Sequence, residues 1–217
     1  MPKYRYERKF HIPTRSISDA VQTIKTHPLM FREIYFERTV NSLYFDTPTL
    51  HSYFESVDGV PHKAKVRVRW YNNDLNESNL EIKIKSGAVG KKLTYELNHF
   101  SLDGNVRKNF IYALKNSDVP QDLKIKLKEL IPASISRFNR RYFISIDKKF
   151  RITLDYRLKF RRILSSKMPS ASFIKVDHIV MEVKYESEDD VDFAKIAGYF
   201  PFRIGKFSKY NKGIGSI

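Results

Sequence analysis

The sequence predicts an α+β fold dominated by β-strands: an eight-stranded antiparallel sheet closed into a tunnel (barrel), with short helices covering its outside. Three observations lead to this prediction. Apolar and charged residues alternate with period two in eight segments, helical patterns are few and short, and Lys and Arg recur at alternate positions within the strand segments. Alternate residues of a strand share one face, so several segments combine an apolar face with a basic one.

The expected strands are 4–12, 39–46, 63–71, 79–85, 93–98, 137–147, 150–161 and 173–185. Segment 150–161 has a regular alternation, with apolar residues at its even positions from Phe150 to Phe160. One such strand is typical of a half-exposed sheet with its charged face in water. The same pattern recurs with mostly one sign of charge, and like charges on neighbouring strands repel, which favours a shared anionic ligand instead.

Four short helices are expected, at 17–25 after a Ser16 cap, 105–115, 121–130 and 191–199. The turn-rich stretches 72–78 and 86–90 are expected to be loops, and 165–172 a connection. Because no repeat or linker divides the chain, we expect one domain over residues 1–217.

Closure of about eight strands would place alternate residues inside a barrel. With the charged faces inside, the apolar faces point outward, where the amphipathic helices can cover them. Buried cations require anions or carboxylates beside them. Glu7 lies between Arg5 and Lys9, Glu81 shares a strand face with Lys83, and three carboxylates are therefore candidates for the interior: Glu7, Glu81 and Glu182.

The charge balance points to an acidic partner. Lys and Arg total 40 against 24 Asp and Glu, a formal net charge of +16. The chain has no cysteine, which excludes disulfides and thiolate metal sites. Because it shows neither a signal-peptide pattern nor an apolar stretch of about 20 residues, we expect a cytoplasmic protein.

Seven motifs together resemble the VTC domain, the polyphosphate polymerase module of the triphosphate tunnel metalloenzyme (CYTH-like) superfamily. They are RYERKF (5–10), SLYFDT (42–47), KVRVRWY (65–71), LEIKIK (80–85), RITLD (151–155), MEVKY (181–185) and FSKY (207–210). The resemblance implies a basic tunnel that holds phosphate chains, a divalent Mn²⁺ or Mg²⁺ ion, and transfer of the terminal phosphate of ATP to a growing polyphosphate chain.

The resemblance also implies roles for individual residues. It assigns catalytic phosphate contacts to Lys9, Arg67, Arg69 and Lys83. It assigns phosphate binding to Arg140, Arg151, Lys206, Ser208 and Lys209, and metal binding to Glu182, with Glu7 and Glu81 as further candidate ligands. Phe138 replaces the tyrosine of the family's tyrosine-x-arginine motif, and the adjacent Arg141 leaves a second register open. The wider superfamily has a glutamate where this chain has Arg5, which favours anion binding over metal binding.

The strand faces add further candidates for substrate binding, namely Arg5, Lys65, Lys85, Lys184 and Tyr44. We interpret Gly87 to Lys92 as a hairpin loop that carries Lys91 and Lys92 to the tunnel rim, because it lacks the full phosphate-loop spacing. Asp46 either shares in orienting a cation with Tyr44 or begins a turn at Asp46-Thr47-Pro48, and the turn is the favoured interpretation.

Two other classes of function stay open. The same fold could serve a tri- or polyphosphatase or a non-catalytic polyphosphate-binding module. A nucleic-acid-binding protein fits less well, because the aromatic residues of segment 150–161 lie opposite its cations. The expected partners are ATP and inorganic polyphosphate or triphosphate, and any role at a membrane would require a separate membrane protein.

Overall fold

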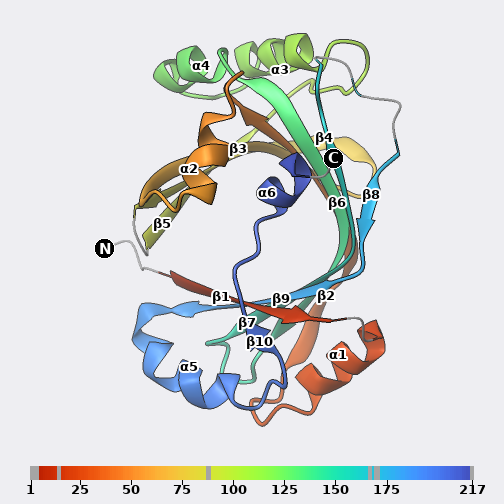
Figure 1. Cartoon of the computed structure of the whole chain (residues 1–217), viewed down its shortest axis with the longest axis vertical. Helices are drawn as coiled ribbons and strands as arrows, with labels where there is room; N and C mark the ends of the chain where they lie inside the picture. The colour runs from red at the N-terminus through yellow and green to blue at the C-terminus, as the bar shows by residue number, and fades with distance from the viewer. Residues whose placement is uncertain (1–4, 14–15, 87–88, 166–167, 169–171, 216–217) are drawn as a thin grey trace. The chain divides into compact units, whose positions relative to one another are not determined.

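The computed structural model describes residues 5–13, 16–86, 89–165, 168 and 172–215, without the side chains of Arg5 and Val89. The strands in this part (Figure 1) are β1 (Arg5–Ile12), β2 (Arg32–Asp46), β3 (His62–Tyr71), β4 (Asp74–Ser86), β5 (Val89–Glu96), β6 (Ile131–Ile144), β7 (Arg151–Arg162), β8 (Ile174–Val176), β9 (Ile179–Glu186) and β10 (Arg203–Ile204). The helices are α1 (Ile17–Lys25), α2 (His51–Val57), α3 (Val106–Lys115), α4 (Gln121–Leu127), α5 (Asp190–Ala197) and α6 (Lys209–Ile214), with a 3₁₀ turn at Ser187–Asp189.

The chain forms two compact units. Unit 1 comprises Met1–Arg38, Phe138–Leu158 and Lys175–Phe207, and unit 2 comprises Thr39–Arg137, Lys159–Ile174 and Ser208–Ile217. The four strands β2, β6, β7 and β8 contribute residues to both units.

The prediction of a β-dominated α+β fold with a large antiparallel sheet is confirmed, but the predicted closure is wrong. The strands pair in the order β10-β1-β9-β7-β6-β2-β3-β4-β5, with β8 on β7. Among the described residues, no ladder joins the two ends of this order, β10 and β5, so the ten-stranded sheet is open. Alternation in a sequence indicates which residues share a face, but it does not indicate which strand edges meet.

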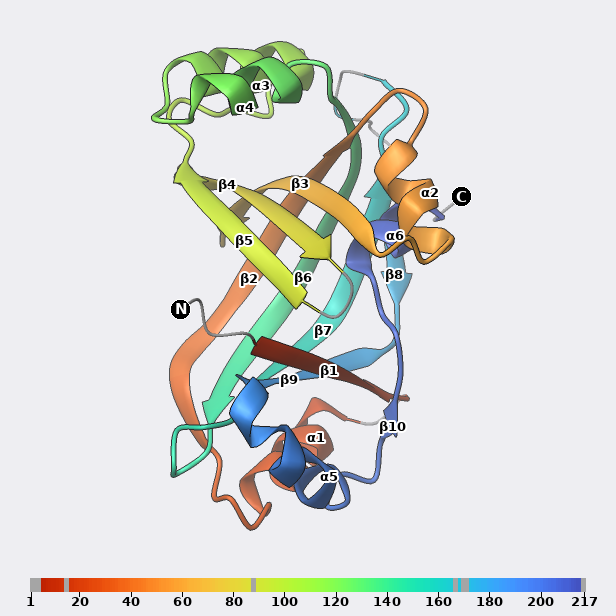
Figure 2. The ribbon, with the colours of Figure 1, turned by 90° about the vertical axis from the view of Figure 1, so that its left-hand side faces the viewer.

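In unit 2, β3, β4 and β5 form an antiparallel meander next to β2 (Figure 2). The register places Tyr44 opposite Arg67, and Arg67 opposite Glu81, so these side chains share a polar face. The other face is apolar and packs on α3 and α4, with Phe45 stacked on Phe110 at 4.0 Å between ring centroids. Burial of this apolar face fixes which side of the meander carries the charges.

In unit 1, β9 pairs with β1 on one side and with β7 on the other. Lys9 lies opposite Glu182, and Glu182 lies opposite Thr153. The alternate residues form a second core, in which Phe10, Leu154 and Met181 pack with α1 and α5. Helices therefore cover the apolar face in both units, as the sequence predicts.

Most predicted elements form, with shifts at their ends. Helix α1 has the predicted bounds, and the Ser16 hydroxyl accepts a hydrogen bond from the backbone N–H of Asp19 at 3.2 Å. The loop predicted at 72–78 is wrong, because Asn72 adopts a left-handed conformation (φ 53°) that allows a tight turn, and β4 begins at Asp74. The predicted loop 86–90 is replaced in part by strand, since Val89 begins β5 and residues 87–88 lie outside the described part.

The chain also contains elements that the sequence did not predict. Helices α2 and α6 have only seven and six residues, too few to show a helical period. The expected strand 173–185 is divided into β8 and β9, and β10 is a two-residue pairing with β1. Of the predicted connection 165–172, residues 166–167 and 169–171 lie outside the described part.

Candidate functional site

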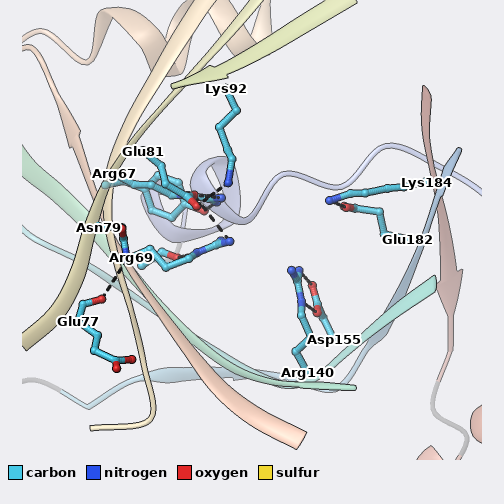
Figure 3. Close-up of polar contacts among 12 residues, drawn as sticks. Arg67, Arg69, Glu77, Asn79, Glu81, Lys92, Arg140, Asp155, Glu182 and Lys184 are labelled. Atoms are coloured by element: carbon cyan, nitrogen blue, oxygen red, sulfur yellow. Dashed lines mark hydrogen bonds and ion pairs between the residues drawn. The ribbon is translucent and has the colours of Figure 1, made fainter. Parts of the chain in front are cut away.

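Three cations meet one buried carboxylate on the polar face of unit 2 (Figure 3). Arg67 donates to Glu81 Oε2 from Nε at 2.7 Å, Arg69 Nη1 lies 3.7 Å from the same oxygen, and Lys92 Nζ lies 2.9 Å from Oε1. Glu81 is buried, whereas Lys92 is half-exposed. We call these four residues, with Tyr44, the Glu81 cluster.

The charges of the Glu81 cluster shift its pKa values. Burial alone would raise the pKa of Glu81, but Arg67, Arg69 and Lys92 hold that pKa well below its usual range. Burial would also raise the pKa of the Tyr44 phenol, yet the same two arginines and Lys209 lower it. The cluster therefore favours negative charge at the positions its cations surround.

Lys65 lies on the same face of β3 as Arg67 and connects it with helix α6. Its ammonium donates to Ser56 Oγ at 2.8 Å and to Ser208 Oγ at 3.1 Å, and it lies 5.4 Å from the ring centroid of Tyr210. Tyr210 donates its hydroxyl to the buried Asp46. The α6 segment is thus held against the polar face of unit 2.

Asp46 serves mainly as a local cap. Its carboxylate accepts hydrogen bonds from the backbone N–H groups of Thr47, Ser52 and Tyr53 at 2.7–3.0 Å. This confirms the turn interpretation of Asp46-Thr47-Pro48. Tyr44 instead has the orienting role, because its hydroxyl accepts a hydrogen bond from Arg67 Nη1 at 3.2 Å.

In unit 1, the buried carboxylate of Glu182 lies between two lysines. Lys184 Nζ is 2.7 Å from Oε1, and Lys9 Nζ is 3.8 Å from Oε2 (the Glu182–Lys184 pair is drawn in Figure 3). Glu7 lies 3.1 Å from Lys9, which also donates to the Phe207 carbonyl at 2.9 Å. We call these four charged residues the Glu182 cluster.

Next to it, Arg140 forms a two-pronged ion pair with the fully buried Asp155, through Nε at 2.5 Å and Nη2 at 2.7 Å (Figure 3). Burial lowers the pKa of Arg140, but Asp155 and Glu182 raise it above its ordinary value. The adjacent Arg141 pairs with Glu33 through two bonds of 2.7 Å. Arg140, and not Arg141, is thus the arginine associated with the Glu182 cluster.

The predicted site residues divide between the two units. Unit 2 contains Tyr44, Lys65, Arg67, Arg69, Glu81, Lys83, Lys85, Lys91, Lys92, Ser208 and Lys209, and unit 1 contains Arg5, Glu7, Lys9, Arg140, Arg151, Glu182, Lys184 and Lys206. Lys83 lies opposite Lys65 on the polar face, and Lys85 lies opposite Lys63. Lys91 lies opposite Ile84 and so on the other face of β5 from Lys92.

The remaining predicted residues of unit 1 are less enclosed. Arg151 is exposed opposite Lys184, and Lys206 is exposed after β10. Arg5 lies on β1 opposite Glu186, but its side chain is outside the described part.

The oxygen ligands near Lys9 suit a hard divalent cation. Glu7 and Glu182 already converge on one positive charge, the Lys9 ammonium, and carboxylate oxygens are ligands that Mg²⁺ and Mn²⁺ prefer. No group of three or more His, Cys, Asp or Glu side chains surrounds a single position in the described residues. Water or a bound ligand would therefore have to complete the coordination, since Mg²⁺ usually keeps several water molecules.

Sequence reasoning missed several partners of the predicted cations. Asp155 shares a strand face with Arg151 and Thr153. It is the one acidic residue in a strongly basic segment, and this could have indicated that it pairs with a cation. Ser42, which accepts from Arg69 Nε at 3.2 Å, and Asn211, 3.3 Å from Lys65, showed no such signal.

Two solved structures share this fold at low sequence identity. One, from Vibrio parahaemolyticus, is provisionally described as an adenylate cyclase and aligns with a TM-score of 0.56 at 11% identity over 100% of both chains. Another, from Bacillus halodurans and with the same provisional description, aligns with a TM-score of 0.53 at 16% identity over 95% of this chain and 94% of that one. These likenesses show a shared fold.

The sequence matches the VTC domain family over residues 4–217, and the chain therefore belongs to that family. This confirms the resemblance that the seven motifs indicated. A comparison with curated proteins found no match. Within the part of the chain that the structure describes, no helix is both long and apolar enough to cross a membrane.

Proposed function

We propose that this chain binds inorganic polyphosphate or triphosphate and, with a divalent metal, transfers the terminal phosphate of ATP to a growing polyphosphate chain. Membership of the VTC family supports a polyphosphate-related function. The observation that carries the proposal is the contact of Arg67, Arg69 and Lys92 with the single carboxylate of Glu81. Cations in this excess fit a ligand with several negative charges.

The residue types suit phosphate. A guanidinium such as that of Arg67 or Arg69 can donate to two phosphate oxygens at once, and Lys92 supplies a mobile point charge. Because Glu81 already holds these donors on one face, their arrangement is largely set before the ligand arrives. Preorganised charge of this kind lowers the barrier of phosphoryl transfer more than covalent help would.

In the proposed reaction, the bond between the γ-phosphorus of ATP and the β–γ bridging oxygen breaks, and ADP leaves with the electron pair. A terminal oxygen of the polyphosphate chain forms the new bond to that phosphorus. Arg67 and Arg69 would neutralise charge on the transferred group and hold it in line. Lys9 and Lys184 would do the same for phosphates bound in unit 1.

A bound divalent ion would supply positive charge that stabilises the transferred phosphate. Glu182 and Glu7 are the residues that would hold it, since both approach the cation already present at Lys9 Nζ. Glu81 is less suited to that role, because it contacts three cations, two of them arginines, whereas Glu182 contacts two lysines, one of them at 3.8 Å.

The test compares Lys92→Ala with Lys91→Ala, neighbouring lysines on opposite faces of β5. Purified protein is incubated with ATP and Mn²⁺, and chain growth and free phosphate are both measured. We expect wild type and Lys91→Ala to lengthen polyphosphate, and Lys92→Ala to bind tripolyphosphate less tightly and elongate more slowly. Free phosphate without elongation in the wild type would assign a phosphohydrolase, and binding without either product would assign a binding module; both outcomes overturn the polymerase proposal.

A further inference from the structure

An arginine makes cation–π contacts with two tyrosines in unit 1. The Arg38 guanidinium of β2 lies 4.9 Å from the ring centroid of Tyr142 on β6 and 5.5 Å from that of Tyr35 on β2. The two rings meet edge to face with centroids 5.6 Å apart. Tyr35 nevertheless keeps 58% of its surface exposed. We call these three residues the Tyr35 platform.

The platform lies close to a residue already associated with the candidate site. Tyr142 follows Arg140 by two positions on β6, so the two side chains project from the same strand face, about 7 Å apart along the strand. Arg140 forms a two-pronged ion pair with Asp155. An aromatic group and a cation that is predicted to bind phosphate thus lie on the same face of one strand, whereas in segment 150–161 the aromatic residues and the cations lie on opposite faces.

We propose that the Tyr35 platform stacks the base of the nucleoside triphosphate donor while the phosphates of that nucleotide extend toward Arg140. The inference rests on the proposed function and deepens it, because it assigns recognition of the nucleotide as distinct from its phosphates. Every nucleobase has a π face that can stack on the exposed ring of Tyr35, and the Arg38 guanidinium places a positive charge 5.5 Å from the centroid of that ring. Inorganic tripolyphosphate has no base and gains nothing from these contacts.

Phe36 provides a matched control for this inference. It neighbours Tyr35 in β2 and is 96% exposed. Among the described residues, its ring makes no aromatic or cation–π contact with the Tyr35 platform. A Tyr35→Leu variant removes the π face from an exposed position, and Phe36→Leu makes the equivalent change one residue away. Neither side chain is buried, so both variants should keep the thermal melting temperature of the wild type.

The experiment measures equilibrium dissociation constants by calorimetry, with Mg²⁺, for ATP and for tripolyphosphate. We expect Tyr35→Leu to weaken ATP binding about tenfold, the effect of losing one base stack, with tripolyphosphate binding unchanged. Phe36→Leu should change neither constant. Equal losses for both ligands, or an unchanged constant for ATP in Tyr35→Leu, would overturn the inference while leaving the proposed function in place.

Two further outcomes distinguish the proposals. A wild type that binds neither ATP nor tripolyphosphate would overturn the proposed function and the inference together. An oligoadenylate that binds more tightly than ATP, and loses affinity in Tyr35→Leu, would assign the platform to single-stranded nucleic acid and overturn its role toward a mononucleotide.

Discussion

Arg67 and Glu81 lie directly opposite each other on β3 and β4, and the guanidinium of Arg67 contacts one carboxylate oxygen of Glu81 through both Nε, at 2.7 Å, and Nη2, at 2.5 Å. The same carboxylate contacts Arg69 and Lys92. Glu81 therefore stabilises three cations in the protein without ligand. In the proposed function it also competes with phosphate for those cations.

Replacing Glu81 with Gln should lower stability and strengthen the response to phosphate chains. The variant keeps the shape of the side chain but leaves partly buried cations without their carboxylate, which costs about 3–5 kcal/mol for a buried ion pair. In thermal melts, tripolyphosphate should raise the melting temperature of Glu81→Gln by more than it raises that of the wild type. The exposed Glu96→Gln on β5 is the control, and equal shifts in all three proteins would contradict the prediction.

Stability should fall in acid through Glu81. Its pKa in the folded protein lies well below the usual 4.5, so the unfolded chain binds more protons as the pH decreases below that value. The stabilisation is present above about pH 4.5 and is lost progressively below it. Urea unfolding between about pH 3 and pH 7 measures this slope. A slope as steep in Glu81→Gln as in the wild type would show that other carboxyls, such as Glu33, account for it.

The Arg140–Asp155 pair should contribute strongly to the stability of unit 1. Asp155→Asn leaves the buried Arg140 charge without its carboxylate, and we expect a loss of about 3–5 kcal/mol in the free energy of unfolding. Asp192→Asn is the control, because its ion pair with Lys195 is exposed and should be worth about 0–1 kcal/mol. Similar unfolding midpoints in urea for the two variants would refute the prediction.

Metal affinity should depend on Glu182 and Glu7. We expect Glu182→Gln and Glu7→Gln to weaken Mn²⁺ binding in the presence of tripolyphosphate. The loss should be about 10- to 100-fold or more, because the loss of a residue that only supports a metal ligand already weakens binding by that factor. Glu33→Gln tests specificity, since Glu33 pairs with Arg141 away from the Glu182 cluster. Calorimetric Mn²⁺ titrations of the three variants provide the measurement. Unchanged affinity in Glu182→Gln would exclude it as a ligand.

Local patterns account for what could be predicted of the fold. Helix α1 begins after the predicted Ser16 cap, and the alternating segments at Lys65 to Tyr71 and at Arg151 to Arg161 both form strands. These features depend on residues close in the chain. The tight turn at Asn72 and the short helix α6 depend on a single left-handed residue and on contacts distant in sequence, and the pattern did not reveal them.

In the candidate site, too, local patterns predict some features, and contacts between residues far apart in the sequence determine the others. That Arg67 and Glu81 share strand faces with other charged residues follows from alternation, and alternation is a local property of an extended chain. The choice of Arg140 over Arg141 as the partner of Asp155 follows from pairing between strands. Lys91 and Lys92 lie on opposite faces because both belong to strand β5, where the sequence predicted a hairpin loop.

The sequence by itself determined the β-dominated class, the family, and the two-faced character of the strands, because each of these is written in residue order and residue type. The tertiary structure alone decided that the sheet stays open and which carboxylate each cation meets. The physical reason is that strand register and edge pairing arise from long-range hydrogen bonds and core packing, whose free energies depend on all the paired segments together.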